Sequence, residues 1–126
     1  LKDFYSRIIC LCNQEEALAS GLFYDLMPPN YPNKAYDSTS VFSFLRGNDT
    51  RLLLIAVNFS DREQSVSIHI PPHAYRFFNR EQCLEKGVRL TSLLEENGEM
   101  MAFRTTDPVN VTLPANDGEI FEISFT

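Results

Sequence analysis

The stretch RLLLIAVNF, residues 51–59, constrains the fold more than any other part of the chain. Its apolar side chains run without interruption from Leu52 to Val57. Because successive side chains of a β-strand point to opposite faces of the sheet, such a strand needs cover on both faces, as central strands have. The run is therefore predicted to be a central strand and the stability centre of the domain.

Most of the other apolar runs alternate with polar residues, which is typical of strands with one face in water. SVSIHI places Val66, Ile68 and Ile70 on one face, and VNVTLP and GEIFEISF repeat the pattern on either side of a PANDG turn. Asn97-Gly98 stands between two further strand-like runs and favours the positive φ angles of a tight hairpin. RLLLIAV and SVSIHI are interpreted as one hairpin around a polar turn, and VNVTLP and GEIFEISF as another.

Together these runs predict an all-β fold: an antiparallel Greek-key β-sandwich of about seven or eight strands, preceded by one N-terminal α-helix. The helix is predicted over residues 2–13 from apolar residues at helical spacing. The residues from Ile8 to Cys12 are consecutive and apolar, so this helix needs neighbours on more than one side. The predicted regions are a linking helix, residues 1–19, and a sandwich domain, residues 20–126.

Charge and cysteine content narrow the range of partners and compartments. The chain has a formal net charge of -6 and its basic residues form no block, so nucleic acid is not expected as a partner. No apolar run approaches the roughly 18 residues of a membrane helix, so no membrane association is expected. Cys10, Cys12 and Cys83 cannot all pair with one another and are interpreted as free thiols, which favours a reducing, cytoplasmic compartment.

The sequence offers no recognisable catalytic or metal-binding constellation. His69 and His73 flank a Pro-Pro pair and have no further ligand at useful spacing, so no metal site is predicted. Glu95, Glu96 and Glu99 crowd a single turn, whereas acid–base catalysis needs carboxylates placed across a cleft. No phosphate or dinucleotide fingerprint occurs, so no cofactor is expected.

A Pro-rich loop, MPPNYPNKAYDS, carries the two residues selected as a candidate contact site, Tyr31 and Tyr36. Aromatic rings held by prolines can stack on a sugar ring or on an apolar partner surface. Alternatively, the two rings seal the sandwich or lie against a neighbouring domain. The sequence leaves both interpretations open.

Five segments follow one another along the chain: DFYSRIICLCNQEEALASG, FSFLR, RLLLIAVNFSD, LTSLL and LPANDGEIFEI. In this order they resemble the carboxy-terminal end of alpha-amylase superfamily glycoside hydrolases. There a helix closes the catalytic barrel, and a β-sandwich follows with an F-x-R strand, a VxxNFS strand, a short DLL segment and a final LPP-type strand. The resemblance covers nearly the whole chain.

The resemblance implies a non-catalytic domain of an enzyme that acts on α-glucans or related α-glucosides. The implied partner is the catalytic barrel of the same parent chain, which would hold the catalytic acids, and no family catalytic residue falls on this chain. Two other classes compete: a carbohydrate-binding module that contacts α-glucan through Tyr31 and Tyr36, and a non-enzymatic immunoglobulin-like interaction domain. The apolar helix face also predicts self-association of the isolated chain, centred on residues 4–12.

Overall fold

The structure is a computed structural model that describes residue 6 and residues 21–48, 51–80, 87–93, 100–104 and 107–125. The described part of the chain is built mainly from β-strands. Its elements, in chain order, are β1 (Leu22–Asp25), α3 (Met27–Asn30), β2 (Val41–Gly47), β3 (Leu52–Asn58), β4 (Gln64–Ile68), α4 (Pro72–Phe77), β5 (Gly87–Ser92), β6 (Met100–Arg104), β7 (Val109–Leu113) and β8 (Asp117–Phe125).

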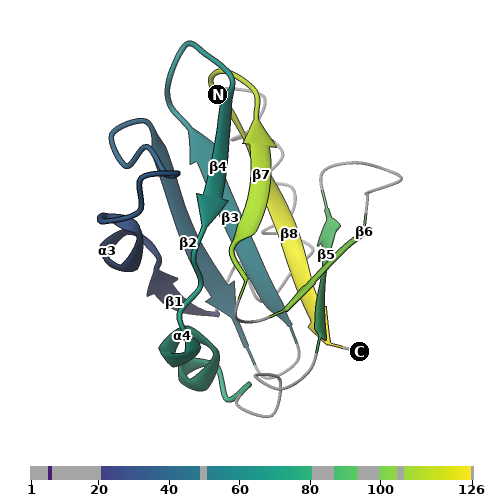
Figure 1. Ribbon diagram of the computed structural model, residues 1–126. Coiled ribbons are helices and arrows are strands. Elements are labelled where there is room, and N and C mark those ends of the chain that lie inside the picture. The colour runs from purple at the N-terminus through teal and green to yellow at the C-terminus, as the bar shows by residue number, and fades with distance from the viewer. Residues whose placement is uncertain are drawn as a thin grey trace.

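The strands form two sheets that face each other (Figure 1). The larger sheet has six strands in the order β1-β2-β3-β8-β5-β6, and the smaller sheet pairs β4 with β7. All these pairs are antiparallel, and three of them nest along the chain: β5 with β6, β4 with β7, and β3 with β8. Nested pairs arise when an antiparallel ribbon rolls up into two sheets, as in Greek-key and jelly-roll folds. The predicted all-β sandwich is confirmed.

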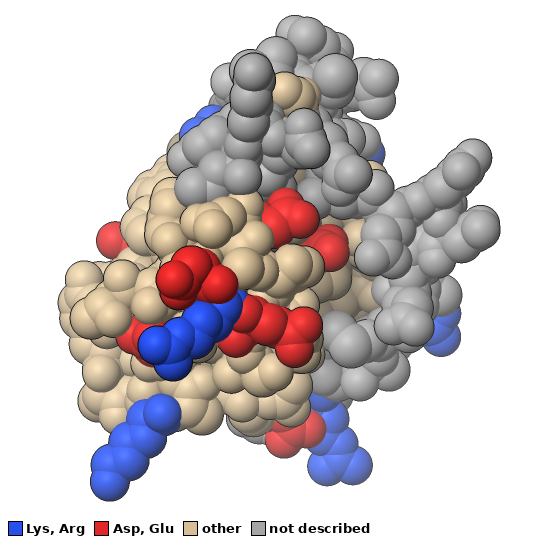
Figure 2. Space-filling view, turned by 90° about the horizontal axis from the view of Figure 1, so that it is seen from above, with Lys and Arg blue, Asp and Glu red and all other residues tan. Residues whose placement is uncertain are grey.

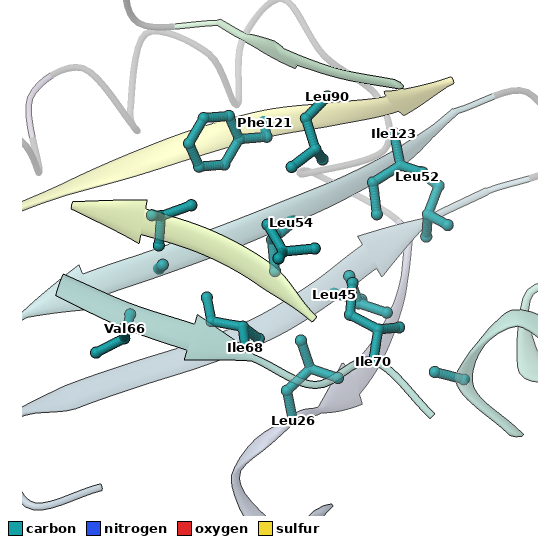
Figure 3. Close-up of a cluster of buried hydrophobic side chains, with 14 of the residues drawn as sticks. Leu26, Leu45, Leu52, Leu54, Val66, Ile68, Ile70, Leu90, Phe121 and Ile123 are labelled. Atoms are coloured by element: carbon teal, nitrogen blue, oxygen red, sulfur yellow. The ribbon is translucent and has the colours of Figure 1, made fainter. Parts of the chain in front are cut away.

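β3 is the central strand that its sequence predicts. It pairs with β2 on one side and with β8 on the other, and all seven of its residues are buried. Leu52, Leu54 and Ala56 belong to the hydrophobic core cluster, part of which is shown between the strands in Figure 3. The residues between these three point to the opposite face of the sheet, because strand side chains alternate.

The two predicted hairpins, β3 with β4 and β7 with β8, are wrong. β4 lies in the smaller sheet, where Val66 stands opposite Val111 and Ile68 opposite Val109. β4 and β7 both alternate between buried and more exposed residues, so both suit a sheet with one face in water. β3 is buried on both faces and lies inside the larger sheet instead. The polar turns therefore carry the chain from one sheet to the other.

Asn58, at the end of β3, ties two of these crossings together. Its Nδ2 lies 2.8 Å from the carbonyl oxygen of Arg62, 3.2 Å from that of Leu113 and 3.1 Å from that of Pro114. Its Oδ1 accepts hydrogen bonds from the backbone N–H and the hydroxyl of Ser60, at 2.9 and 2.8 Å. One buried amide thus holds the β3–β4 connection against the β7–β8 connection.

Two short helices, α3 and α4, were not predicted. α4 begins at Pro72, and α3 contains Pro28 in its first turn. The N–H groups of a first turn have no partner within the helix, so a proline, which has no N–H group, fits there without losing a hydrogen bond. Met27 of α3 and Ala74 and Tyr75 of α4 belong to the core cluster. The Pro-Pro pair therefore ends one strand and starts a helix that adds to the core.

Some predictions fall outside the described residues. The helix predicted over residues 2–13 does so except for Ser6, which is helical, so this helix and the boundary between residues 19 and 20 stay predictions. β5 and β6 pair with Thr91 opposite Met100, whereas the Asn97-Gly98 turn is not described. Within the described ranges, no helix is long and apolar enough to cross a membrane.

Candidate interdomain surface

The larger sheet has a second face, which we call the outer face, on the side opposite the core cluster. Residues directly opposite each other on neighbouring strands point to the same face, so the register identifies its members. Ile55 of β3 stands opposite Phe44 of β2 and Ile120 of β8, and Leu53 of β3 stands opposite Arg46 of β2. The core cluster contains none of these five residues. The larger sheet is therefore apolar on both of its faces.

The outer face is covered over the central strands of the sheet and partly open at the β1 edge. Leu53, Ile55 and Ile120, from the central strands, are each at most 1% exposed. Phe23, on the edge strand β1, is 46% exposed, and Phe59, which directly follows β3, is 49% exposed. Apolar surface thus continues from the covered strands to the open edge of the sheet. Exposed aromatic surface of this kind is typical of interaction sites.

A row of phenylalanine rings crosses β1 and β2 on this face. The ring centroids of Phe23 and Phe44 lie 5.1 Å apart, and those of Phe44 and Phe42 lie 5.5 Å apart. Phe42, at the end of the row, also packs against the core cluster. In VFSFLR, both phenylalanines of β2 alternate with Val41 and Leu45, which are buried in the core. The sequence reasoning missed this surface, although the double alternation was a signal that β2 carries apolar side chains on both faces.

The two tyrosines selected from the sequence lie in different environments. Tyr36 is 5% exposed, and its hydroxyl lies 2.8 Å from Ser43 Oγ and 3.2 Å from the carbonyl oxygen of Val41. Burial raises the pKa of Tyr36, and the hydrogen bond with Ser43 opposes this shift. Tyr36 is therefore buried within the domain, and its assignment as a contact residue stays a prediction. Tyr31 is 62% exposed, and its contact role stays a prediction.

The Pro-rich loop covers the edge of β4 with side-chain amides. Asn30 Nδ2 donates to the carbonyl oxygen of His69 at 2.9 Å, and Asn30 Oδ1 accepts from the His69 N–H at 2.8 Å. Asn33 Nδ2 donates to the carbonyl oxygen of Ser67 at 2.7 Å, and the Ser67 N–H donates to the carbonyl oxygen of Ala35 at 3.0 Å. The loop therefore replaces a neighbouring strand and protects an edge that would otherwise be open to pairing.

A polar groove of about 380 Å³ lies over the solvent-facing side of β4 and β7. Two hydroxyls in its lining, Ser65 Oγ and Thr112 Oγ1, bond to each other at 3.1 Å. Asp37 also lines the groove, and hydrogen bonds from Thr39 and Ser40 lower the pKa of its carboxyl. A general acid needs the opposite shift, so Asp37 is poorly suited to protonate a leaving group.

The histidines and acidic residues form no metal centre in the part of the chain that the structure describes. No group of three or more His, Cys, Asp or Glu residues there could hold a metal ion. His73 Nδ1 lies 3.1 Å from Tyr24 Oη, and His69 is exposed. Figure 2 shows acidic and basic side chains side by side at one end of the molecule. One ion pair of exposed side chains joins Asp61 and Arg62 at 4.0 Å.

Comparison with known proteins gives matches among solved structures. The sequence matches no family model and no curated protein. An alpha-amylase from Anoxybacillus aligns over 88% of this chain with a TM-score of 0.58 and 20% identity. An alpha-amylase from Geobacillus thermoleovorans, complexed with acarbose, aligns over 88% with a TM-score of 0.59 and 15% identity. AmyP in complex with maltose aligns over 84% with a TM-score of 0.54 and 12% identity.

The chain spans only 19%, 20% and 17% of these three structures, respectively. It therefore has the fold of a small part of alpha-amylases. This finding confirms, at the level of fold, the resemblance that the five sequence segments carry.

Proposed function

We propose that this chain is the non-catalytic carboxy-terminal domain of an alpha-amylase-type glycoside hydrolase that acts on α-glucans, and that it stabilises the catalytic barrel by packing against it. The observation that carries the proposal is the fold match to about a fifth of alpha-amylase chains. A domain of this size has a single hydrophobic core, and on this proposal the active site lies in the rest of the parent protein.

The outer face supports a packing role. Burying apolar area stabilises a contact by about 25 cal/mol per Å². Phe23 and Phe59 leave roughly half of their side chains open on or beside a face whose centre is already covered. A neighbouring domain that completes this cover would stabilise both partners without touching the bond that is cleaved.

The groove over β4 and β7 supports the non-catalytic part of the proposal. Retaining and inverting glycosidases both need two carboxyl groups on either side of the scissile bond, one of them with a raised pKa. Asp37 is the one acidic residue in the described lining, and its pKa is lowered. Neither requirement is met by the groove lining that the structure describes.

Carbohydrate binding is a second candidate function because Tyr31 is 62% exposed on a loop that hydrogen bonds hold in place. Calorimetric titration with maltoheptaose tests it, with Tyr31→Ala as the variant and Tyr36→Phe as a control for the buried ring. Saturable binding that Tyr31→Ala removes would favour this function over the packing role. Weak or absent binding is the expected result.

The packing role is tested by deleting residues 21–126 from the parent enzyme. We expect the shortened enzyme to lose thermal stability, with a half-life of activity that falls at elevated temperature, because apolar barrel surface becomes exposed. The 126-residue chain alone should not turn over soluble starch. An unchanged inactivation rate after deletion, or turnover by the chain that is lost on mutating one of its own acids, would contradict the proposal.

A further inference from the structure

Arg46 is an unusual residue on the outer face. It lies on β2, directly opposite Phe23 of β1 and Leu53 of β3. The residue as a whole is partly exposed, but its Nε is buried and has no hydrogen-bond partner in the part of the chain that the structure describes. The Nε–H of an arginine can donate a hydrogen bond but cannot accept one, so Arg46 Nε is a buried donor without an acceptor among the described residues.

Arg51, at the start of β3, shows how the same sheet satisfies such a group elsewhere. Its Nε donates to Glu122 Oε2 at 2.6 Å, and both side chains are about one third exposed. A buried donor that lacks an acceptor is disfavoured, and charged donors more strongly than neutral ones. The contrast between the two arginines indicates that Arg46 is arranged to meet an acceptor from outside the described residues.

The open aromatic surface lies around the same residue. Phe23, directly opposite Arg46, is 46% exposed, and its ring contacts Phe44 on the outer face. On the other side of Arg46, Leu53 is fully buried. An apolar contact patch therefore lies at the boundary between the covered and the open half of the outer face, next to an arginine whose Nε lacks a partner among the described residues.

We propose that the β1–β2 half of the outer face is the surface on which the catalytic domain docks, and that an acidic side chain on a helix of that domain pairs with Arg46. This inference rests on the proposed function and names the contact through which that function acts.

The chemistry of the surface selects this partner. A guanidinium fork pairs best with a carboxylate, and phenylalanine rings pack against apolar side chains. Helices form the outer layer of a (β/α) barrel, and helices can pack onto the face of a sheet. A two-fold contact with a second copy of this chain would bring two Arg46 side chains onto one surface, which the like charges disfavour.

The test compares Arg46→Met, Phe23→Ser and a matched control, Arg76→Met, whose arginine is exposed on α4. Thermal unfolding of each variant is measured in the 126-residue chain and in the parent protein with its catalytic domain. In the chain alone, Arg46→Met should leave Tm unchanged or raise it, because an unpaired buried nitrogen is removed. In the parent, Arg46→Met and Phe23→Ser should each lower Tm by about 2–4 °C, and Arg76→Met should not.

If Arg46→Met changed Tm equally in the chain and in the parent, the proposal would be overturned. This comparison remains available even if Phe23→Ser fails to fold. If deleting the domain lowers the parent's stability but Arg46→Met behaves like Arg76→Met, the docking surface is wrong and the proposed function stands. If deletion changes nothing, the proposed function itself fails. A dimer of the chain that Phe23→Ser abolishes, with no effect in the parent, would assign this face to a second copy and also overturn the proposal.

Discussion

Single asparagine side chains fix the points at which this chain changes direction. Asn58 is fully buried and holds two connections between the sheets, and Asn30 is fully buried and holds the Pro-rich loop against β4. An amide can do this because it donates and accepts at once, as a backbone peptide group does. The Asn-Phe-Ser segment at the end of β3 therefore has a structural meaning: Asn58 fastens the crossings, and Ser60 holds the Asn58 amide in place by donating its backbone N–H and its hydroxyl to Oδ1.

Replacing Asn58 should destabilise the fold more than its size suggests. Asn58→Ala leaves the carbonyl groups of Leu113 and Pro114 without this donor, and an unsatisfied buried polar group costs about 1–3 kcal/mol. Asn58→Asp keeps the shape but turns a carboxylate oxygen towards those carbonyls, so its loss should be larger at neutral pH. Urea unfolding measures both, with Asn110→Asp as the exposed control on β7. Equal midpoints for Asn58→Asp and Asn110→Asp would contradict this role.

The buried phenol of Tyr36 should make stability depend on alkaline pH. Burial raises its pKa above the ordinary value of 10.0, so the folded state holds the proton more tightly than the unfolded chain does. The stability that this contributes is complete below pH 10.0 and is lost as the pH rises through the folded-state pKa.

Tyr36→Phe removes this titration. The variant should lose about 1 kcal/mol at neutral pH, because its hydrogen bond with Ser43 is gone, and should then lose less stability than the wild type above pH 10.0. Urea midpoints on both sides of that pH give the comparison, and Tyr31→Phe is the exposed control. Parallel pH profiles for Tyr36→Phe and the wild type would show that the ring is not buried in solution.

At the scale of elements, the strands could be predicted and their partners could not. Hydrophobic periodicity reports how many faces of a strand are buried, so the central position of β3 and the one-sided burial of β4 and β7 followed from sequence. Periodicity does not report which strand lies alongside, because a polar turn serves a hairpin and a crossing between sheets equally well. The short helices α3 and α4 were missed because prolines at a helix start also end strands.

Truncation of β3 on either face should cost the same. Leu54 points into the core cluster and Ile55 to the outer face, yet both are at most 1% exposed. Leu54→Ala and Ile55→Ala should each lose about 2–5 kcal/mol through lost transfer energy and a residual cavity. Ser67→Ala, on the half-exposed side of β4, should lose much less. The measurement is the denaturant midpoint of each variant. If Ile55→Ala had the same midpoint as Ser67→Ala, the outer face would be open to solvent in solution.

For the molecule as a whole, the larger sheet is the middle layer of a structure that needs cover on two sides. The described part of the chain provides β4, β7, α3 and α4 on the core side only. The candidate site drawn from sequence, Tyr31 and Tyr36, depended on residue type, and burial then separated the two rings. The docking surface around Arg46 could not be predicted, because it depends on which residues three neighbouring strands bring together.

The last prediction concerns the isolated chain, which should self-associate. The helix predicted over residues 2–13 is apolar on nearly every side, and the outer face leaves Phe23 and Phe59 half open. Uncovered apolar area costs about 25 cal/mol per Å², so the predicted helices of two copies should pair as concentration rises. Sedimentation compares the 126-residue chain with a chain shortened to start at residue 20 and with Phe23→Ser. Association lost on shortening would bear out the helix contact. Association lost only in Phe23→Ser would contradict it and assign the contact to the outer face, against the docking proposed above, and a strictly monomeric chain would contradict the prediction outright.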